Sequence, residues 1–512
     1  MQRSTLSPRQ RADHACSFCR QRKRACDRIL PQCSTCISKQ VVCEYSIDRQ
    51  WSVSLAPIDI AGEPKGPIFL TDGPASEKRP HLLSSGLFTP LPPALLGRVS
   101  RFGASEWVLA SLGDGKTVAN EYFDRIHWWW PMIAKSQVSP RLADIENYDG
   151  ELTLLLLAMK VIAWRPSKQG SLDPDPITSA YVTAKHALSE AAMTSNLSLR
   201  LLQAQILVAI YETGHAIYPA AFISVAACAQ YGYAMHANQV LDPKNLTPNA
   251  SFNRLEREEQ RRTWWAILIL DRHLHLGNPS HRLCTEDPSS ESLLPTNDDL
   301  LGPEITGSSF PVSAPASLDM GSFARMAQAA HLLGKVLHFT ESSLEFGGWQ
   351  TRQARQNEYW QLDKTVRSLL NLSYLEGEMK RMAICGQTAI CYSALVALHD
   401  SQHSRTDPEY LQFTVELLKP VVDLMMLDSD VFLSGRLVSI EDASPILIRW
   451  AYDAGLILSR LASLYEFSDL EHLRRMVGKL EIMSQRWLAA EVCLKLLADK
   501  SGVSESLTSH AI

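Results

Sequence analysis

The sequence has 512 residues, 46% of them hydrophobic and 21% charged, so it is long enough for two or three domains with a sizeable core. Residues 1–43 hold nine Lys or Arg and two acids, a net charge of +7, which leaves 41 basic and 53 acidic residues (−12) for the rest. A basic head on an acidic body predicts that a polyanion binds the head alone. No apolar run is long enough to cross a bilayer, and the N-terminus lacks the apolar stretch of a secretory signal, so we expect neither a membrane partner nor secretion.

A duplicated cysteine spacing is the first feature of the chain. The unit C-x2-C-x6-C occurs twice, at Cys16, Cys19, Cys26, Cys33, Cys36 and Cys43. Without a secretory signal we expect a reducing compartment, where clustered cysteines are better explained as metal ligands than as disulfides.

The spacing itself indicates a two-zinc cluster. Cysteines three residues apart lie on one face of a helical turn and can grip one ion, and structural zinc takes four ligands. Two zinc ions need eight ligand positions, which six cysteines supply only if two of them bridge. Apolar residues are few between Cys16 and Cys43, so metal binding would have to stabilise this fold. A small structural domain with one zinc ion and a disulfide-bonded domain remain the alternatives to a two-zinc cluster.

A basic run, Arg20-Gln21-Arg22-Lys23-Arg24, separates the second cysteine from the third, and Asp27 and Pro31 follow. With these residues the stretch resembles the zinc binuclear cluster (Zn(2)-Cys(6)) domain of fungal transcription factors. The resemblance implies that Cys16 and Cys33 are the bridging ligands. It also implies that the first helix enters the major groove of double-stranded DNA and reads a CGG-like triplet.

The same resemblance assigns roles within the basic run. Lys23 takes the place of the main base-reading lysine with Arg22 beside it, and both can donate to guanine. Arg20 and Arg24 would contact phosphate, which positions the head without reading sequence. Ala25 departs from the family, which often has a basic residue there. A nuclear localisation signal, or simply a solvated face, is the other interpretation of this run.

Prolines dominate residues 48–100. They stand at positions 57, 64, 67, 74, 80, 90, 92 and 93 and interrupt any helix, which predicts a flexible linker. No heptad series follows the cysteines, so a coiled-coil dimer is not expected. A monomer on one half-site and a homodimer formed through the large domain both stay open.

Apolar residues recur at helical spacing in the remaining sequence and predict an all-helical domain over residues 101–500, followed by a tail over 501–512. The segments with the clearest pattern are Leu201–Tyr211, Ala221–Met235, Thr263–Leu276, Met320–Phe339, Met379–His399 and Ala443–Leu464. The predicted fold class is therefore mostly α: a small two-zinc domain over 12–47, a proline-rich linker and a large helical regulatory domain.

Several short motifs between residues 118 and 300 resemble those of the regulatory fungal-specific transcription factor domain. They include Tyr122-Phe123, Gln203-Ala204-Gln205, and Arg261-Arg262-Thr263-Trp264-Trp265 followed by Asp271-Arg272. The usual Gly-Arg-Pro is replaced by Gly277-Asn278-Pro279. We expect the charged residues of these motifs to form an ion-pair network, and the tryptophans, with Trp128, Trp129 and Trp130, to belong to the core. The spacing of His273, His275 and His281 does not fit a zinc enzyme.

An enzyme is the competing class. Ala110 to Thr117 is close to a phosphate-binding loop with Ala in place of the first Gly, and Ile267 to Asp271 could pass for a strand ending in a metal-binding Asp. Such a loop needs a strand before it, whereas helices are predicted on both sides. No convergent acid, base and nucleophile is found either. We therefore expect no enzyme.

Residues Leu283 to Ala324 carry seven acids and no Lys or Arg, mixed with Ser, Pro and Leu. This composition suits an acidic activation segment or a solvated loop between helices.

Taken as a whole, the sequence predicts a nuclear, pathway-specific regulator of RNA polymerase II genes that holds two zinc ions. A homodimer, a small-molecule effector or a transcriptional coregulator would act through its helical body. Both an activator and a repressor fit these features.

Overall fold

The computed structural model describes residues 15–29, 32–39, 43, 105–143, 149–166, 175–194, 197–245, 254–277, 282–297, 309–315, 320–341, 349–380, 385–400, 443–462 and 468–501. The chain divides into two compact units, Met1–Thr89 and Pro90–Ile512. The predicted linker, and the tail from residue 502 on, lie outside the described residues.

Within the described residues of the first unit, one short helix lies in each cysteine repeat. Helix α1 spans Ser17–Gln21 and helix α2 spans Ser34–Lys39. The two helices contact each other. Four of the cysteines are fully buried in this unit, and the partly buried Phe18 packs against them.

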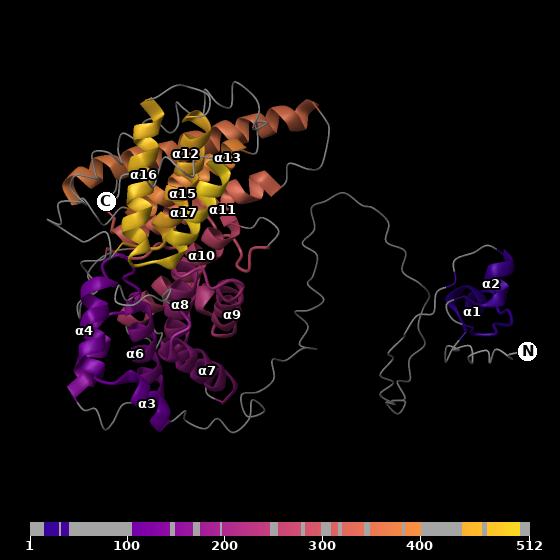
Figure 1. Cartoon of the computed structure of the whole chain (residues 1–512), viewed down its shortest axis with the longest axis horizontal. Coiled ribbons are helices and arrows are strands. Elements are labelled where there is room, and N and C mark those ends of the chain that lie inside the picture. Colours follow the sequence, from indigo (N-terminus) through magenta and orange to yellow (C-terminus); the bar gives the residue numbers. More distant parts are fainter. Residues whose placement is uncertain are drawn as a thin grey trace, which may run out of the picture. The chain divides into compact units, whose positions relative to one another are not determined.

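The second unit is built from helices (Figure 1). Its α-helices are α3 (Glu106–Leu112), α4 (Gly115–Arg125), α5 (Lys135–Val138), α6 (Gly150–Ala163), α7 (Ser179–Thr194), α8 (Leu199–Gly214), α9 (Ala220–Ala234), α10 (Arg254–Gly277), α11 (Ser322–Glu341), α12 (Trp349–Lys380), α13 (Cys385–Asp400), α15 (Ile446–Ala462), α16 (Ser468–Ser484) and α17 (Leu488–Ser501). Within the described ranges, β structure is limited to one isolated bridge between Leu293 and Pro311. The predicted mostly α class is confirmed, and no helix in these ranges is long and apolar enough to span a membrane.

Five of the six strongest apolar patterns fall on single helices, namely α8, α9, α10, α11 and α15, and extend at most three residues beyond the helix at either end. The sixth pattern, Met379–His399, falls on two helices. Met379 belongs to α12, which ends at Lys380, and α13 begins at Cys385. Residues 381–384 lie outside the described part of the chain.

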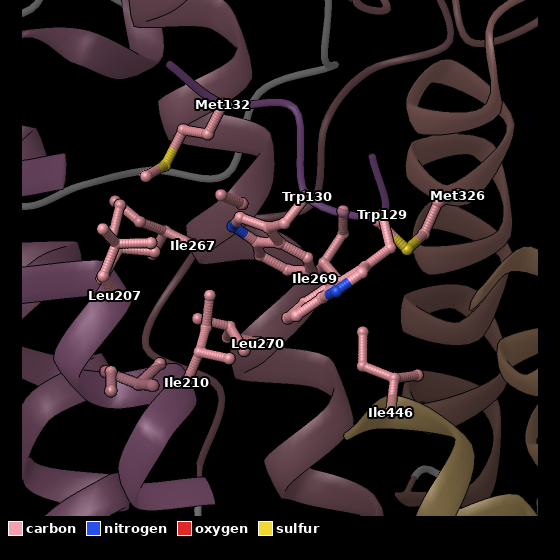
Figure 2. Packing of buried hydrophobic residues seen from close by; sticks show 14 of the residues in the cluster. Trp129, Trp130, Met132, Leu207, Ile210, Ile267, Ile269, Leu270, Met326 and Ile446 are labelled. Carbon is pink, nitrogen blue, oxygen red and sulfur yellow. The ribbon is translucent and has the colours of Figure 1, made fainter. Parts of the chain in front are cut away.

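Helix α10 lies at the centre of the body (Figure 1). It contacts α8 and α9 on the N-terminal side, and α11 and α13 on the C-terminal side. Figure 2 shows Trp130 beside Ile267 and Ile269 of α10, between Leu207 on one side and Met326 on the other. Trp130 and Trp265 are fully buried and Trp129 and Trp264 nearly so, which confirms that these tryptophans form core rather than a ligand cage. One continuous core therefore surrounds α10.

Charged residues of α10 lie inside this core and are satisfied there. Arg262, fully buried, donates to Glu258 Oε1 at 2.9 Å and to the carbonyl oxygens of Pro131 and Thr296 at 2.8 Å each. Arg261 also pairs with Glu258. Burying a charge is costly unless it is paired and hydrogen-bonded, and this network meets that requirement. The predicted ion-pair network is present, but it ties α10 to loops more than to other helices.

The Asp271-Arg272 pair continues the network toward the segment after α10. Asp271 accepts hydrogen bonds from the backbone N–H groups of Cys284 (3.0 Å) and Thr285 (2.9 Å) and from the Thr285 hydroxyl at 2.6 Å. Arg272 Nη2 lies 2.7 Å from Asp287 Oδ1. Lys335 and His338 of α11 approach the other oxygen of Asp287 at 3.9 and 3.2 Å. Segment 284–287 is thereby held to both α10 and α11.

The segment from Ala110 to Thr117, which resembles a phosphate-binding loop in sequence, contains a turn between two helices. Helix α3 ends at Leu112, Gly113 follows with φ at +72°, and α4 begins at Gly115. The Asp114 carboxylate accepts from the N–H groups of Lys116 and Thr117, each at 3.2 Å, and so caps α4. The N–H groups that a phosphate would need already donate to the Asp114 carboxylate, and a helix rather than a strand precedes the turn. The geometry excludes a nucleotide site at this turn.

Replacing Asp271 with Asn tests how far the network stabilises the body. The amide can accept at one atom only and would direct an N–H toward the donors of Cys284 and Thr285. We expect D271N to lower the free energy of unfolding of the full-length chain by roughly 2–3 kcal/mol in urea denaturation. Asp124→Asn, on the exposed face of α4, is the matched control and should change it by less than about 0.5 kcal/mol. Equal losses in the two variants would contradict this account.

Candidate metal centre and nucleic-acid interface

Each cysteine repeat places its C-x2-C pair at the start of a helix. Cys16 is the N-cap of α1 and Cys19 lies within that helix. Cys33 directly precedes α2, and Cys36 lies within α2. Because residues three apart share one helical face, each pair directs two sulfurs to the same side. All four of these cysteines are completely buried.

The six sulfurs fall into two groups of four that share two members. One group is Cys16, Cys19, Cys26 and Cys33, and the other is Cys16, Cys33, Cys36 and Cys43, with all Sγ atoms of a group within 4.8 Å of one another. The structure therefore brings all six predicted cysteines together. It supplies eight ligand positions from six sulfurs, through Cys16 and Cys33.

The sulfur separations fit a metal and not a disulfide. Cys16 Sγ lies 3.8 Å from Cys33 Sγ and 3.6 Å from Cys36 Sγ, and Cys19 Sγ lies 3.8 Å from Cys33 Sγ. A tetrahedron with zinc–sulfur bonds of about 2.3 Å has edges of about 3.8 Å. A disulfide would require about 2.05 Å, and all six cysteines carry free thiols. The donor set fits zinc, and the disulfide-bonded domain is excluded.

Two thiols of this cluster, those of Cys19 and Cys36, resist ionisation in the absence of metal. Burial, together with hydrogen bonds to Cys16 and Cys33, raises the pKa of Cys19 to about 12. Burial likewise raises the pKa of Cys36, and the adjacent thiols add to it. Since only thiolates bind zinc, metal binding must release these protons, so zinc affinity falls as the pH is lowered.

Asp27, directly after the third cysteine, joins the two repeats. Its carboxylate accepts a hydrogen bond from the Ser34 backbone N–H at 3.1 Å and another from the Ser34 hydroxyl. The hydroxyl bond lowers the pKa of Asp27. The Thr35 hydroxyl also donates to the Ala25 carbonyl oxygen at 3.1 Å. Asp27 thus caps α2 from the other repeat, a role that the sequence pattern did not reveal.

The basic run occupies the C-terminal end of α1 and the turn that follows. Arg20 lies in the last turn of α1, and Arg22 is its C-cap. Lys23 has a left-handed backbone (φ 49°), and the Arg24 N–H donates to the Cys19 carbonyl oxygen at 2.9 Å. All four basic side chains are exposed. Arg22 lies over the Phe18 ring, 5.4 Å from its centroid, a contact that can restrain the guanidinium.

The described histidines of the body form no comparable centre. Burial lowers the pKa of His273 to about 4, and His275 Nε2 lies 3.0 Å from Glu341 Oε1. His281 lies outside the described residues. Among the residues that the structure describes, only the cysteines gather into groups with metal-ligand spacing.

Much of the acidic stretch 283–324 is packed rather than solvated. Leu294 and Thr296 are buried, and Trp265 Nε1 donates to the Leu293 carbonyl oxygen at 2.9 Å. This packing differs from both a free activation segment and a solvated loop. Residues 298–308 and 316–319 of the stretch lie outside the described part of the chain.

Two family profiles match the chain. Residues 14–52 match the fungal Zn(2)-Cys(6) binuclear cluster domain, and residues 119–372 match the fungal specific transcription factor domain. The first match contains the cysteine cluster, and the second begins in α4 and ends in α12. No solved structure matches the chain significantly.

Curated proteins similar to the chain are fungal regulators. Transcription factor BOA15 of Botryotinia fuckeliana is 37% identical over 130 residues, which cover 25% of this chain and 70% of that protein. The citrinin biosynthesis transcriptional activator mrl3 of Monascus ruber is 24% identical over 359 residues, covering 59% and 68%. The azaphilone cluster-specific transcription factor azaR of Aspergillus niger is 23% identical over 394 residues, covering 72% and 80%.

Family profiles, relatives and sulfur geometry agree on a transcription factor rather than an enzyme. Such a cluster domain binds two zinc ions and has DNA as its partner, and this family acts in the nucleus. The chain belongs to the fungal transcription factors with a Zn(2)-Cys(6) binuclear cluster domain.

Proposed function

We propose that the chain is a pathway-specific regulator of RNA polymerase II genes in the nucleus, and that it reads CGG-like triplets. The observation that carries the proposal is an exposed basic run attached to a six-sulfur cluster. Three relatives are named for citrinin biosynthesis, an azaphilone cluster and pigment biosynthesis. Those names support regulation of one set of biosynthetic genes.

The proposed zinc ligands are Cys16, Cys19, Cys26, Cys33, Cys36 and Cys43, with Cys16 and Cys33 shared between the ions. Zinc supplies structural crosslinks here, and the chain supplies thiolates held by two helical turns. The tetrahedral edge lengths among the sulfurs support this assignment. Asp27 is proposed to fix α2 against α1 through Ser34, so that the two halves of the cluster keep their spacing.

The proposed DNA contacts follow from where the basic side chains lie. Lys23 and Arg22 are exposed at the C-terminal end of α1, and side chains of this length can donate to guanine O6 and N7. Arg20 and Arg24 flank them and contact phosphate. Ala25 offers no charge, so one phosphate contact found in many relatives is absent from this proposal. The same basic run is proposed to direct nuclear import.

We propose four regions along the chain: a DNA-binding domain over 12–47, a linker over 48–100, a regulatory domain over 101–500 and a tail over 501–512. The division into units at Thr89 and Pro90 supports a boundary in this region. Because the head is basic and the body acidic, the phosphate backbone attracts only the head. The body is proposed to regulate activity through a small-molecule effector, a coregulator or a homodimer.

Substituting one shared and one unshared cysteine tests the ligand assignment. We expect native mass spectrometry of the wild-type chain to find two zinc ions. Cys16→Ser removes a ligand from both ions and should leave neither bound stoichiometrically, whereas Cys26→Ser should spare the ion held by the other group. Equal zinc contents in the two variants would contradict the shared role of Cys16. One zinc ion in the wild type would contradict the two-ion cluster.

Substituting Lys23 tests the base-reading assignment. We expect Lys23→Ala to weaken binding to a CGG site by roughly 1–3 kcal/mol in a mobility-shift titration, and to reduce discrimination against an altered triplet. Lys39→Ala, at an exposed lysine of α2, is the control and should change affinity for both sequences equally. Unchanged discrimination in K23A would show that another residue reads the bases.

A further inference from the structure

A cavity of about 210 Å³ opens between α9, α10 and the start of the segment that follows α10. Its apolar lining comes from Phe222, Ile223, Val225 and Ala226 of α9, together with Leu274 of α10. Val225 and Leu274 are buried, whereas Ile223 is 65% exposed. The exposed Ile223 beside this cavity shows that part of the apolar lining is open to solvent.

The polar side chains around the cavity differ in how far they are already engaged. The Asp271 carboxylate is saturated by donors from Cys284 and Thr285. His275 Nε2 is paired with Glu341, while its buried Nδ1 has no hydrogen-bond partner among the described residues. Burial raises the pKa of the Cys284 thiol, and the nearby Asp271 adds to this effect, so the thiol stays neutral.

Arg282 brings an exposed positive charge to this lining. It lines the cavity and is exposed, and within the part of the chain that the structure describes it makes no ion pair. An apolar hollow with one available cation at its rim suits a ligand with an apolar body and one negative end. A guanidinium can hold a carboxylate through two parallel hydrogen bonds.

We propose that this cavity binds a small aromatic carboxylic acid, with its ring against Phe222 and Leu274 and its carboxylate on Arg282. The cavity is smaller than the roughly 300 Å³ of a drug-sized pocket, which limits the ligand to on the order of ten to fifteen non-hydrogen atoms. Naming this ligand an effector rests on the proposed function; the binding site itself does not.

The wall of the cavity connects it to the rest of the body. Cys284 lines the cavity, and its N–H is held by Asp271. Three residues later, Asp287 pairs with Arg272 of α10 and approaches Lys335 of α11. A ligand that shifts this wall therefore acts on the contact between two central helices, which is a physical route from the cavity to the body.

Titrating the full-length chain with 2-naphthoate and with its uncharged analogue 2-naphthamide tests the proposal by calorimetry. We expect 2-naphthoate to bind about tenfold more tightly, because only it carries the charge that Arg282 pairs with. Arg282→Gln should lower the affinity for 2-naphthoate about tenfold and leave that for 2-naphthamide unchanged. No binding of 2-naphthoate by the wild type, or equal affinities for the two probes, would overturn the proposal.

Filling the cavity gives an independent readout. Ala226→Phe places a ring in the hollow from a half-buried position and should abolish binding of both probes, whereas Ala227→Phe, on the exposed side of α9, should not. Unchanged binding in A226F would place the ligand elsewhere and overturn the proposal. If the probes behave as expected but the chain does not shift CGG-site DNA, the proposed function fails and the cavity assignment stands.

Discussion

Among the described residues of the DNA-binding head, the buried cluster consists of four cysteines, so the structure of the head depends on these sulfurs rather than on a hydrocarbon core. Four buried cysteines, with Phe18 packed against them, are too little apolar surface to order two helices. The separations of 3.6 to 3.8 Å between their sulfurs are those of a filled metal tetrahedron. Metal binding and folding of the head are therefore one process, and the orientation of the basic run depends on both.

Helix α10 plays the corresponding role in the body, by a different physical means. Its buried arginines would be strongly destabilising if unpaired, so the loops that satisfy them are fixed where they are. Glu258 and Arg262 hold the backbone near Pro131 and Thr296, and Asp271 holds Cys284 and Thr285. The segment that Asp271 anchors forms one wall of the cavity at α9. The network and the cavity thus share a structural element.

Local patterns predicted what local physics determines. The cysteine spacing predicted the cluster, and apolar periodicity located five helices, although α10 begins well before its apolar pattern does. The Asp27–Ser34 contact joins two repeats, and the packing of residues 284–297 depends on partners in α10. Both need the fold before they can be seen, and so does the cavity, because its lining comes from three separate segments.

Zinc X-ray absorption of the full-length chain tests most directly whether shared thiolates hold two ions. The account predicts a first shell of four sulfurs at about 2.3 Å around each zinc. It also predicts a zinc–zinc path on the order of 3 Å, since two tetrahedra that share the Cys16–Cys33 edge must bring their centres that close. A first shell containing nitrogen or oxygen, or a spectrum without a second zinc, would contradict it.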